Sequence, residues 1–340
     1  MKILFIRFSS IGDIVLTTPV IRCVRQQFPD AEIHFLVKES FKPVLVANPH
    51  INVIHTLDKD LKETITNLKQ EKFDYLIDLH RNLRTMRVKK ALDVPSFTFD
   101  KLNFKKWLYV NFKWNVMPDK SIVDRYFEGL KALKVKNDGA GLDYFIPEQL
   151  KTKQEDIPYG HSVGFVGCVI GGSYFTKKLP VDRWKEFVAH CPYPIILLGG
   201  PEDRDDGNLI AAADTAKVYN ACGKFNINES ADLVKRARVV VSNDTGLMHI
   251  AAAFKKPIVS LWGNTTPEMG MFPYYGFNNL NQNVSRLSVM LEVRNLSCRP
   301  CSKIGHHQCP KKHFKCMNNI SPAQMADNVK AFWKQDAKAQ

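Results

Sequence analysis

Short apolar runs alternate with longer amphipathic stretches along the N-terminal part of the chain. The short runs are rich in β-branched and aromatic residues, which is typical of buried strands, and the longer stretches are typical of helices. The pattern therefore predicts strands at residues 2–8, 32–37, 53–57 and 75–79, with helices at residues 14–28 and 61–70 between them.

A polar segment at residues 134–158 interrupts this alternation. Its glycines and prolines, among them Gly139, Gly141 and Pro147, are typical of a linker. Beyond it the alternation resumes, which predicts strands at residues 162–169, 195–198, 239–242 and 258–262, and helices at residues 181–190, 229–237 and 246–254.

Alternating strands and helices form parallel sheets with right-handed crossovers. Two such series in 340 residues predict an α/β protein with two Rossmann-like domains, at residues 1–157 and 158–320, and a terminal segment at residues 321–340. Ligands of such sheets bind at the carboxyl ends of the strands, so we expect the site in a cleft between the domains.

Composition narrows the class of partner. The chain has 48 Lys and Arg residues against 34 Asp and Glu, for a net charge of +14. This surplus favours a nucleic acid, an anionic membrane or a phosphorylated small molecule, unless it only solubilises the surface. The hydrophobic share of 45% argues against disorder. Because the sequence contains neither a signal peptide nor an apolar run that could span a bilayer, we expect a cytoplasmic protein.

The loop after the first predicted strand contains Ser10, Gly12 and Asp13. Gly12 permits a tight turn, and Asp13 falls at or beside the N-terminus of the next helix. Asp13 is either a helix cap or a general base that takes a proton from an attacking hydroxyl. The loop lacks the G-x-G-x-x-G fingerprint, so a dinucleotide site is not indicated.

Residues 171–182 follow the first strand of the second domain and predict an anion site. Paired glycines let backbone N–H groups approach a ligand, while Ser173 and Thr176 add hydroxyls and Lys177 adds a positive charge. Such a loop suits the diphosphate of a leaving group, although an ordinary glycine turn has the same residues.

A third motif begins where the predicted strand at residues 239–242 gives way to Asp244. Thr245 and Gly246 then begin a helix, whose N-terminal donors suit phosphate or sugar hydroxyls, although Asp and Thr are also ordinary caps. His249 lies one turn into this helix, which fits either a ligand contact or a buried, hydrogen-bonded histidine.

A basic stretch interleaved with aromatic residues follows the strand predicted at residues 75–79. It is typical of a surface for glycolipid phosphates or an anionic leaflet, of a nucleic-acid surface, or of a solvated helix face. Its members are Arg81, Arg84, Arg87, Lys89, Lys90, Lys101, Lys105 and Lys106, with Phe97, Phe99, Phe104, Trp107 and Tyr109.

Four cysteines lie close together near the C-terminus: Cys298, Cys301, Cys309 and Cys316. Four thiolates can hold a structural zinc ion. Their spacing differs from the paired C-x2-C pattern of many zinc sites, so a reduced loop without metal also fits. The remaining cysteines, at positions 23, 168, 191 and 222, predict core packing.

Three segments in order resemble glycosyltransferase family 9, the heptosyltransferases: RFSSIGDIVLTTPVIRCVRQQFPDAEIHFLV, GGSYFTKKLPVDRW and VSNDTGLMHIAAAFKKPIVSLWGNTTP. The resemblance implies a GT-B fold and an inverting, metal-independent transfer from an ADP-heptose-like nucleotide diphosphate sugar. It implies a lipopolysaccharide core or related phosphorylated glycolipid as acceptor, and a protein peripheral at the anionic inner membrane. It also implies that the terminal segment is a helix packing back on the N-terminal domain.

The resemblance also assigns roles to individual residues. Asp13 would be the catalytic base, and Lys177 would neutralise the departing diphosphate. The resemblance places the donor against Ser173, Glu229, Asp244, Thr245, Gly246 and His249, and the hydroxyl in the glycine loop adds Thr176. Apart from the resemblance, the position of the basic stretch after the strand at residues 75–79 places Arg81, Arg84 and Arg87 at the acceptor side of the cleft, with Ser10 and Gly12 of the first loop.

Two other classes of protein stay open. A sugar-nucleotide epimerase or hydrolase on the same architecture would consume donor without acceptor. A nucleic-acid-binding module would use the basic stretch and bind with a steep salt dependence. We expect the transferase, with no catalytic cofactor and no nucleic-acid partner, and with heptose or hexose as the donor sugar.

Overall fold

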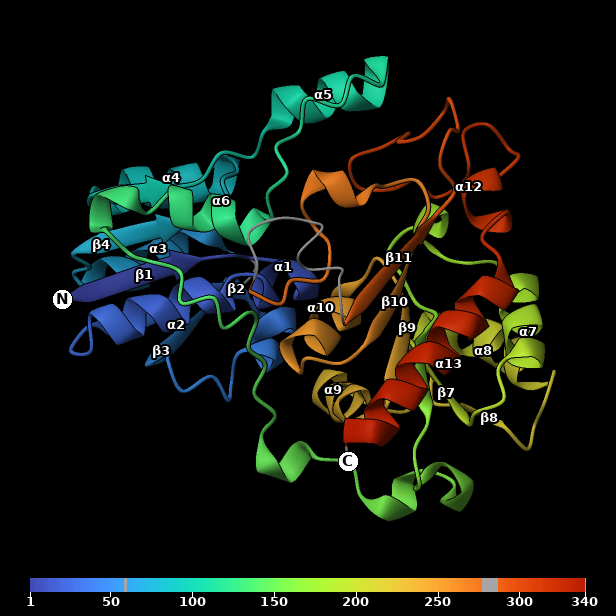
Figure 1. The fold of residues 1–340 in the computed structure, drawn as a ribbon. Helices are drawn as coiled ribbons and strands as arrows, with labels where there is room; N and C mark the ends of the chain where they lie inside the picture. The colour runs from blue at the N-terminus through green and yellow to red at the C-terminus, as the bar shows by residue number, and fades with distance from the viewer. Residues whose placement is uncertain (58–59, 277–286, 340) are drawn as a thin grey trace.

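Two parallel β-sheets organise the chain in the computed structural model, which describes residues 1–57, 60–276 and 287–339 (Figure 1). The first sheet has five strands in the order β3-β2-β1-β4-β5, and the second has six in the order β11-β10-β9-β6-β7-β8. All the described pairings between neighbouring strands are parallel. The prediction of two parallel α/β units is therefore confirmed.

The strands of the first sheet form where the apolar runs predicted them. In β1 (Lys2–Ile6), every side chain after Lys2 is buried, as expected for the centre of a parallel sheet covered on both faces. The other strands are β2 (Glu32–Lys38), β3 (Val53–Leu57), β4 (Tyr75–Asp78) and β5 (Ser96–Thr98).

The helix predicted at residues 14–28 is instead two helices, α1 (Ile11–Val15) and α2 (Thr18–Gln27). Pro19 lies in the first turn of α2, where a missing N–H is tolerated, whereas inside a continuous helix it would break a hydrogen bond. The remaining helices of this unit are α3 (Leu61–Gln70), α4 (Leu83–Leu92), α5 (Asn103–Phe112) and α6 (Ile122–Glu128), with 3-10 turns η1 (Glu39–Val44) and η2 (Lys131–Leu133).

The second sheet is centred on β9 (Val239–Asn243), which is buried along its whole length. The strand predicted at residues 162–169 begins later, as β6 (Val166–Val169), because Gly164 has a positive φ of 142° that a strand does not accommodate. The other elements are η6 (Phe175–Lys177), α7 (Val181–His190), β7 (Ile195–Leu198), η7 (Pro201–Asp203), α8 (Arg204–Ala211), β8 (Val218–Asn220), α9 (Ile227–Arg236), α10 (Gly246–Ala253), β10 (Ile258–Trp262), η8 (Pro267–Met269), β11 (Ser288–Glu292) and α12 (Lys315–Asn318).

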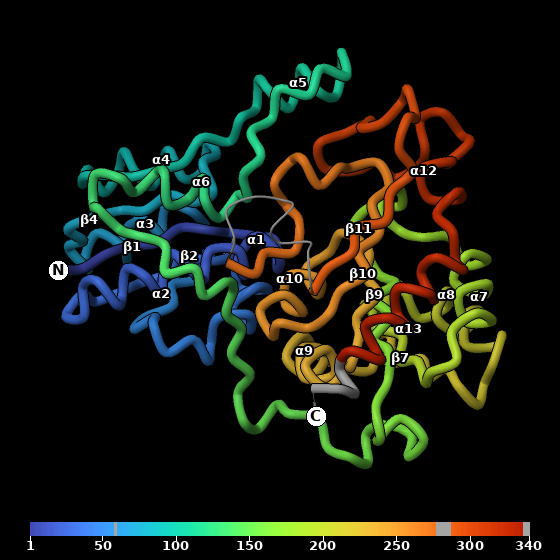
Figure 2. The backbone as a smooth tube through the Cα atoms, viewed as in Figure 1, coloured from blue at the N-terminus to red at the C-terminus, as the bar shows by residue number. Residues whose placement is uncertain are grey.

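Residues 134–158, described throughout, connect the two units without a strand or an α-helix, as predicted for a linker. Figure 2 shows this green segment descending from the first unit to the lower side of the view. Arg22 of α2 anchors its beginning, with Nε 2.8 Å from Asp138 Oδ2 and a further ion pair to Asp143. The linker also contains 3-10 turns η3 (Glu148–Leu150) and η4 (Gln154–Asp156), and η5 (Tyr159–His161) follows it.

The terminal helix α13 (Pro322–Ala339) packs against α7, β9 and β10 of the second unit (Figure 1). Its Met325 and Val329 are buried in the same hydrophobic cluster as Trp184 of α7. The expectation that this helix packs back on the N-terminal domain is therefore wrong, because the apolar side of α13 is covered by the second unit. Among the described residues, no helix combines the length and hydropathy that crossing a bilayer requires.

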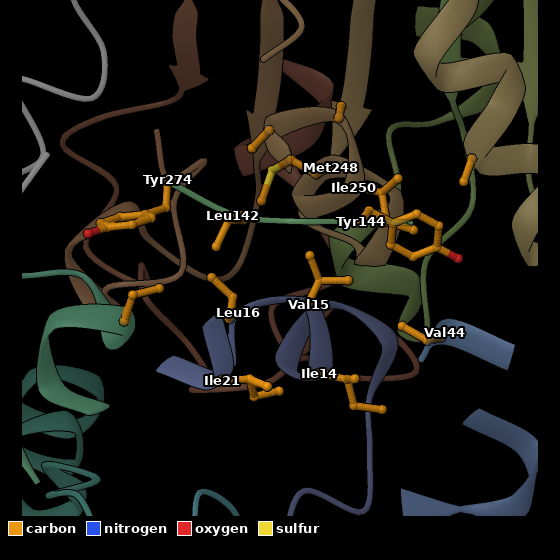
Figure 3. Close-up of a cluster of buried hydrophobic side chains, with 14 of the residues drawn as sticks. Ile14, Val15, Leu16, Ile21, Val44, Leu142, Tyr144, Met248, Ile250 and Tyr274 are labelled. Carbon is orange, nitrogen blue, oxygen red and sulfur yellow. The ribbon is translucent and has the colours of Figure 1, made fainter. Parts of the chain in front are cut away.

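Helices α1 and α10 pack against each other and join the two units. Two glycines make the approach close, since a Cβ on Gly12 would lie 2.6 Å from His249 Cδ2 and one on Gly246 would lie 2.8 Å from Ile11 Cβ. The carboxyl ends of β1 and β9 therefore meet at this junction. Figure 3 shows its buried side chains, which include Ile14, Val15, Leu16, Met248 and Ile250, with Leu142 and Tyr144 of the linker.

Candidate active site at the junction of the two units

Asp13 lies in the first turn of α1, just beyond the carboxyl end of β1. Arg7 Nη2 is 2.5 Å from Asp13 Oδ1, and the Ser10 hydroxyl donates to Asp13 Oδ2 at 2.7 Å. Burial raises the pKa of Asp13, but the Arg7 charge and the Ser10 hydrogen bonds outweigh burial and hold this pKa below its usual value. The carboxylate is therefore ionised near neutral pH and can accept a proton.

Three cations of the first unit, Arg7, Lys101 and Lys106, interact electrostatically with Asp13. Burial and nearby positive charges lower the pKa of Lys101, which precedes α5, and lower that of Lys106 to about 8. Burial and the Arg7 charge likewise lower the pKa of His80 to about 4. Such a concentration of cations suits a phosphorylated ligand.

The three arginines expected at the acceptor side differ in their contacts. Arg81 Nη1 donates to the Phe99 carbonyl at 2.9 Å, beside the end of β5. The charge of Arg84 acts on His80. Arg87 is exposed on α4, and no interaction among the described residues connects it with Asp13.

On the second unit, Lys177 pairs with the buried Asp244, with Nζ 2.6 Å from Oδ2. The Thr265 hydroxyl donates to the same oxygen at 3.0 Å. The ammonium is thereby held at the carboxyl end of β9 and near the N-terminus of α10. A negative group there would meet both a positive charge and the helix dipole.

The N-terminus of α10 has unused donors. Thr245 occupies the N-cap position, but its side chain makes no capping hydrogen bond, and its buried hydroxyl has no partner among the described residues. A Cβ on Gly172 would lie 3.7 Å from Thr245 Cγ2 and 3.8 Å from Lys177 Cβ. The glycine turn, the lysine and the helix N-terminus therefore border one region that suits an anion.

His249 is buried between the two halves of this site. Burial lowers its pKa to about 4, and the charges of Asp244, Asp13 and Lys177 all act on it. The imidazole is therefore neutral near pH 7, and its ring packs against the position of Gly12. These interactions bring the two carboxylates and the lysine around one side chain.

Three residues predicted for the donor site make other contacts. Thr176 is buried, and its hydroxyl accepts from the His306 backbone N–H at 2.8 Å. Glu229 accepts from the Asn226 backbone N–H at 2.7 Å and so caps α9. Ser173 is exposed. The described contacts do not connect these three side chains with Lys177.

The four C-terminal cysteines, all free thiols, line one cavity together with His313. Cys298 Sγ lies 3.8 Å from His313 Nε2. Burial raises the pKa of Cys301, and it raises that of Cys316 to about 12, so these thiols stay protonated unless a cation stabilises the thiolates. The four residues predicted as metal ligands thus line one cavity, but among the described residues the group whose ligand atoms lie within 4.8 Å of one another is a different one.

A second group of ligand types consists of His34, His55 and Glu71, whose ligand atoms lie within 4.8 Å of one another. His34 Nδ1 is 2.8 Å from His55 Nε2, and His34 Nε2 is 2.9 Å from Glu32 Oε1. Both nitrogens of the His34 ring are therefore satisfied by hydrogen bonds, which explain the group without a metal.

Sequence reasoning does not single out Arg7, Thr265 or Arg299. Arg299 Nη2 donates to the Thr265 carbonyl at 2.9 Å, and Arg299 Nε donates to the Gly263 carbonyl at 2.6 Å, so Arg299 orients the turn that carries Thr265. The one signal in the sequence that could have pointed to Arg7 is its charge directly after an apolar strand. Thr265 and Arg299 give no such signal, because their partners are distant along the chain.

Two parallel α/β units that meet at their carboxyl strand ends make up the GT-B fold, which this chain shares with solved heptosyltransferase structures. The expected GT-B fold is therefore confirmed. Residues 62–303 match the family described as glycosyltransferase family 9 (heptosyltransferase), and the chain belongs to this family.

Relatives are similar over most of the chain. Lipopolysaccharide heptosyltransferase 2 of Escherichia coli K12 is 22% identical over 79% of this chain and 84% of its own length. Lipooligosaccharide heptosyltransferase 2 of Haemophilus influenzae is 25% identical over 79% of this chain and 85% of its own length. A glycosyltransferase family 9 structure from Veillonella parvula has a TM-score of 0.76 at 22% identity, over 98% of this chain and 97% of that one. The structure of E. coli ADP-heptose lps heptosyltransferase II has a TM-score of 0.68 at 19% identity, over 99% of this chain and 100% of that one.

Proposed function

We propose that this glycosyltransferase moves a heptose from ADP-heptose, with inversion at the anomeric carbon, onto a lipopolysaccharide core or related phosphorylated glycolipid. The observation that supports this most directly is the arrangement around His249, on which Asp13 from one unit and Lys177 and Asp244 from the other all act. A base and a cation from different units suit a displacement between two bound substrates. The names of the relatives favour heptose and a lipopolysaccharide acceptor.

In this proposal Asp13 takes the proton of the acceptor hydroxyl while that oxygen attacks the anomeric carbon. Arg7 and Ser10 orient the carboxylate and keep it ionised. A positioned base of this kind typically contributes about 10²–10⁴-fold to the rate. Attack from the face opposite the diphosphate inverts the configuration of the sugar.

Lys177 stabilises the negative charge that develops on the departing ADP. Thr245 and Gly246 offer backbone donors at the N-terminus of α10, which adds a favourable dipole, so this scheme requires no catalytic metal or cofactor. When Lys177 turns to the diphosphate, Asp244 is left with Thr265 and can accept from a sugar hydroxyl. We keep three further residues as proposed donor contacts: Ser173, Glu229 and Thr176. Their side chains would have to move to reach the sugar nucleotide.

We assign acceptor binding to residues 1–157 and donor binding to residues 158–320. Ser10, Gly12, Arg81 and Arg84 would border the acceptor, and the cations beside Asp13 would meet its phosphates. Such an acceptor is amphiphilic, so the enzyme would work as a cytoplasmic protein at the anionic surface of the inner membrane.

A nucleotide panel tests the donor half of the proposal. We expect ADP and ADP-heptose to raise the unfolding temperature of the wild type and Lys177→Ala to lose most of this shift, because the variant lacks the cation beside the diphosphate. Lys153→Ala, at an exposed linker position, is the matched control. Stabilisation by UDP or GDP alone would contradict the ADP donor, and salt-sensitive oligonucleotide binding without any nucleotide response would favour a nucleic-acid-binding module.

The products test the reaction itself. Wild-type enzyme with donor and a phosphorylated core acceptor should yield a glycoside whose anomeric configuration, read by NMR, is opposite to that of the donor. Retained configuration would contradict the inverting mechanism. Consumption of donor at the same rate without acceptor would instead indicate an epimerase or hydrolase.

We also propose that Cys298, Cys301, Cys309 and Cys316 hold a structural zinc ion. The four thiols and His313 around one cavity fit its ligand preferences, and a bound cation would stabilise the thiolates that burial disfavours. Thr176 also lines this cavity and neighbours Lys177, so zinc would fix the segment that carries the lysine.

Elemental analysis of the purified protein tests this assignment. About one zinc per chain is expected for the wild type and for Cys23→Ala, which removes a core thiol elsewhere. Cys309→Ser should lose the metal and unfold at a lower temperature. Protein without stoichiometric metal would contradict the site, and stoichiometric iron would change the identity of the ion.

A further inference from the structure

Helix α5 exposes large aromatic side chains to solvent. None of its residues is buried, and Phe104 and Trp107 are 69% and 51% exposed. Just beyond the helix, Trp114 is 64% exposed. Trp107 and Trp114 are the two tryptophans among the strongly exposed side chains of the described residues. Exposed aromatic groups of this size mark a surface that another phase or molecule covers.

The aromatic side chains form one continuous surface, the α5 patch, which consists of Phe104, Trp107, Phe112 and Trp114. Ring centroids are 6.1 Å apart between Phe104 and Trp107, 5.3 Å between Trp107 and Phe112, and 5.6 Å between Phe112 and Trp114. Figure 1 shows α5 at the outer edge of the molecule, away from both sheets. The patch is therefore available to a partner without any rearrangement of the core.

The other side of α5 faces the protein. Lys113 Nζ donates to the Pro300 carbonyl at 2.8 Å, which attaches the end of the helix to the cysteine-containing loop of the second unit. Lys106 interacts electrostatically with Asp13 and Lys303. The helix is thus attached at its end to the second unit, its Lys106 interacts electrostatically with Asp13, and its aromatic rings are exposed.

The charges around the patch identify what covers it. Lys101, Lys105, Lys106 and Lys113 lie within or beside the aromatic segment, in a chain of net charge +14. Tryptophan and phenylalanine interleaved with lysine is the composition of segments that lie in the interface of an anionic bilayer. A second copy of the chain would bring the same lysines together and be repelled.

We propose that the α5 patch inserts into the surface of an anionic lipid bilayer and so holds the candidate active site against the membrane. The exposed Lys105 contacts lipid phosphates while the rings enter the acyl boundary. This inference rests on the proposed function for its purpose, since a lipid-linked acceptor is then delivered beside Lys106 and Asp13. The insertion itself needs neither donor nor acceptor.

Vesicle flotation tests the insertion directly. Wild-type protein should float with vesicles of phosphatidylcholine and phosphatidylglycerol, and brominated lipids should quench its tryptophan fluorescence. Trp107→Ser/Trp114→Ser should bind at least roughly tenfold more weakly, because each ring contributes interfacial burial. Tyr159→Ser, at a 90% exposed aromatic position in η5, is the matched control and should float like the wild type. Asp13→Asn should also float, because binding does not involve the chemistry.

Three results would overturn the proposal. The first is a wild type that does not float, and the second is a double variant that is folded by circular dichroism and floats like the wild type. The third is a wild type that is a dimer while the double variant is a monomer, with equal flotation of the two proteins. Flotation uses no sugar nucleotide, so its result does not depend on whether the transferase proposal is correct. A failure of flotation likewise leaves the transferase proposal untouched.

Discussion

Asp13 is held from two sides, by a guanidinium and by a hydroxyl, which leaves it ionised but oriented. Asn has the same shape and cannot take a proton. We expect Asp13→Asn to lower kcat about 10²–10⁴-fold while the ADP-induced rise in unfolding temperature is retained. Steady-state release of ADP measures the rate. Asp182→Asn, in the first turn of α7, is the control for a charge lost at a helix start, and an equal loss there would contradict a specific role for Asp13.

Arg7 acts on the reaction through Asp13, as a positioning residue. Burial raises the pKa of Asp13 and the Arg7 charge lowers it, so removal of that charge lets the effect of burial prevail. We therefore expect Arg7→Gln to move the acidic limb of the kcat/KM profile to higher pH. The pH dependence of ADP release measures this shift. A slower enzyme with an unmoved limb would show that Arg7 serves only the fold.

At the scale of elements, the contact of α1 with α10 depends on two glycines. Alanine is ordinarily the better helix former, but a Cβ on Gly12 would lie 2.6 Å from the buried His249 ring, so the clash outweighs the propensity. We expect Gly12→Ala to destabilise the protein by about 1–3 kcal/mol in denaturant unfolding. Gly160→Ala, where nothing lies within 4 Å of the added Cβ, should have little effect. Equal stability of the two variants would contradict a tight junction.

The elements also show where local patterns are reliable. The apolar strands β1, β2, β9 and β10 lie close to their predicted positions, since burial on both faces leaves a continuous apolar run. The break between α1 and α2 and the position of α13 depend on what each segment packs against. α5 was not predicted as an element, because its exposed aromatic and basic residues lack the apolar side of a core helix.

At the scale of the whole molecule, the pair of Arg22 with Asp138 holds the linker to α2. The Arg22 hydrogen bond lowers the pKa of Asp138 to about 2. A carboxylate whose pKa is lowered on folding contributes stability above its unfolded pKa, and this contribution is lost as the pH falls through about 2. We expect Asp138→Asn to cost about 1 kcal/mol near pH 7, after allowance for solvent screening, and nothing once the wild-type carboxylate is protonated.

Denaturant unfolding at several pH values measures this difference. Asp30→Asn, at an exposed position that follows α2, is the control and should match the wild type throughout. A cost for Asp138→Asn that stays constant down to the lowest pH would contradict the role of the Arg22 pair.

The sequence by itself determined the two parallel α/β units, the linker and the positions of the polar loops at the strand ends. These follow from periodicity and turn residues, which act between near neighbours in the chain. The loops around Asp13, Lys177 and Asp244 could therefore be named before any contact was known. Their roles in the proposed reaction stay predictions.

Only the tertiary structure decided which of these residues meet. Arg7 with Asp13, Lys177 with Asp244 and Thr265, the cysteine cavity and the contact of Lys113 with Pro300 all depend on the fold. Lys177 and Asp244 are 67 residues apart in sequence, so no local pattern relates them. Such contacts form because two sheets, each specified locally, bury their helices against each other and bring the ends of distant strands together.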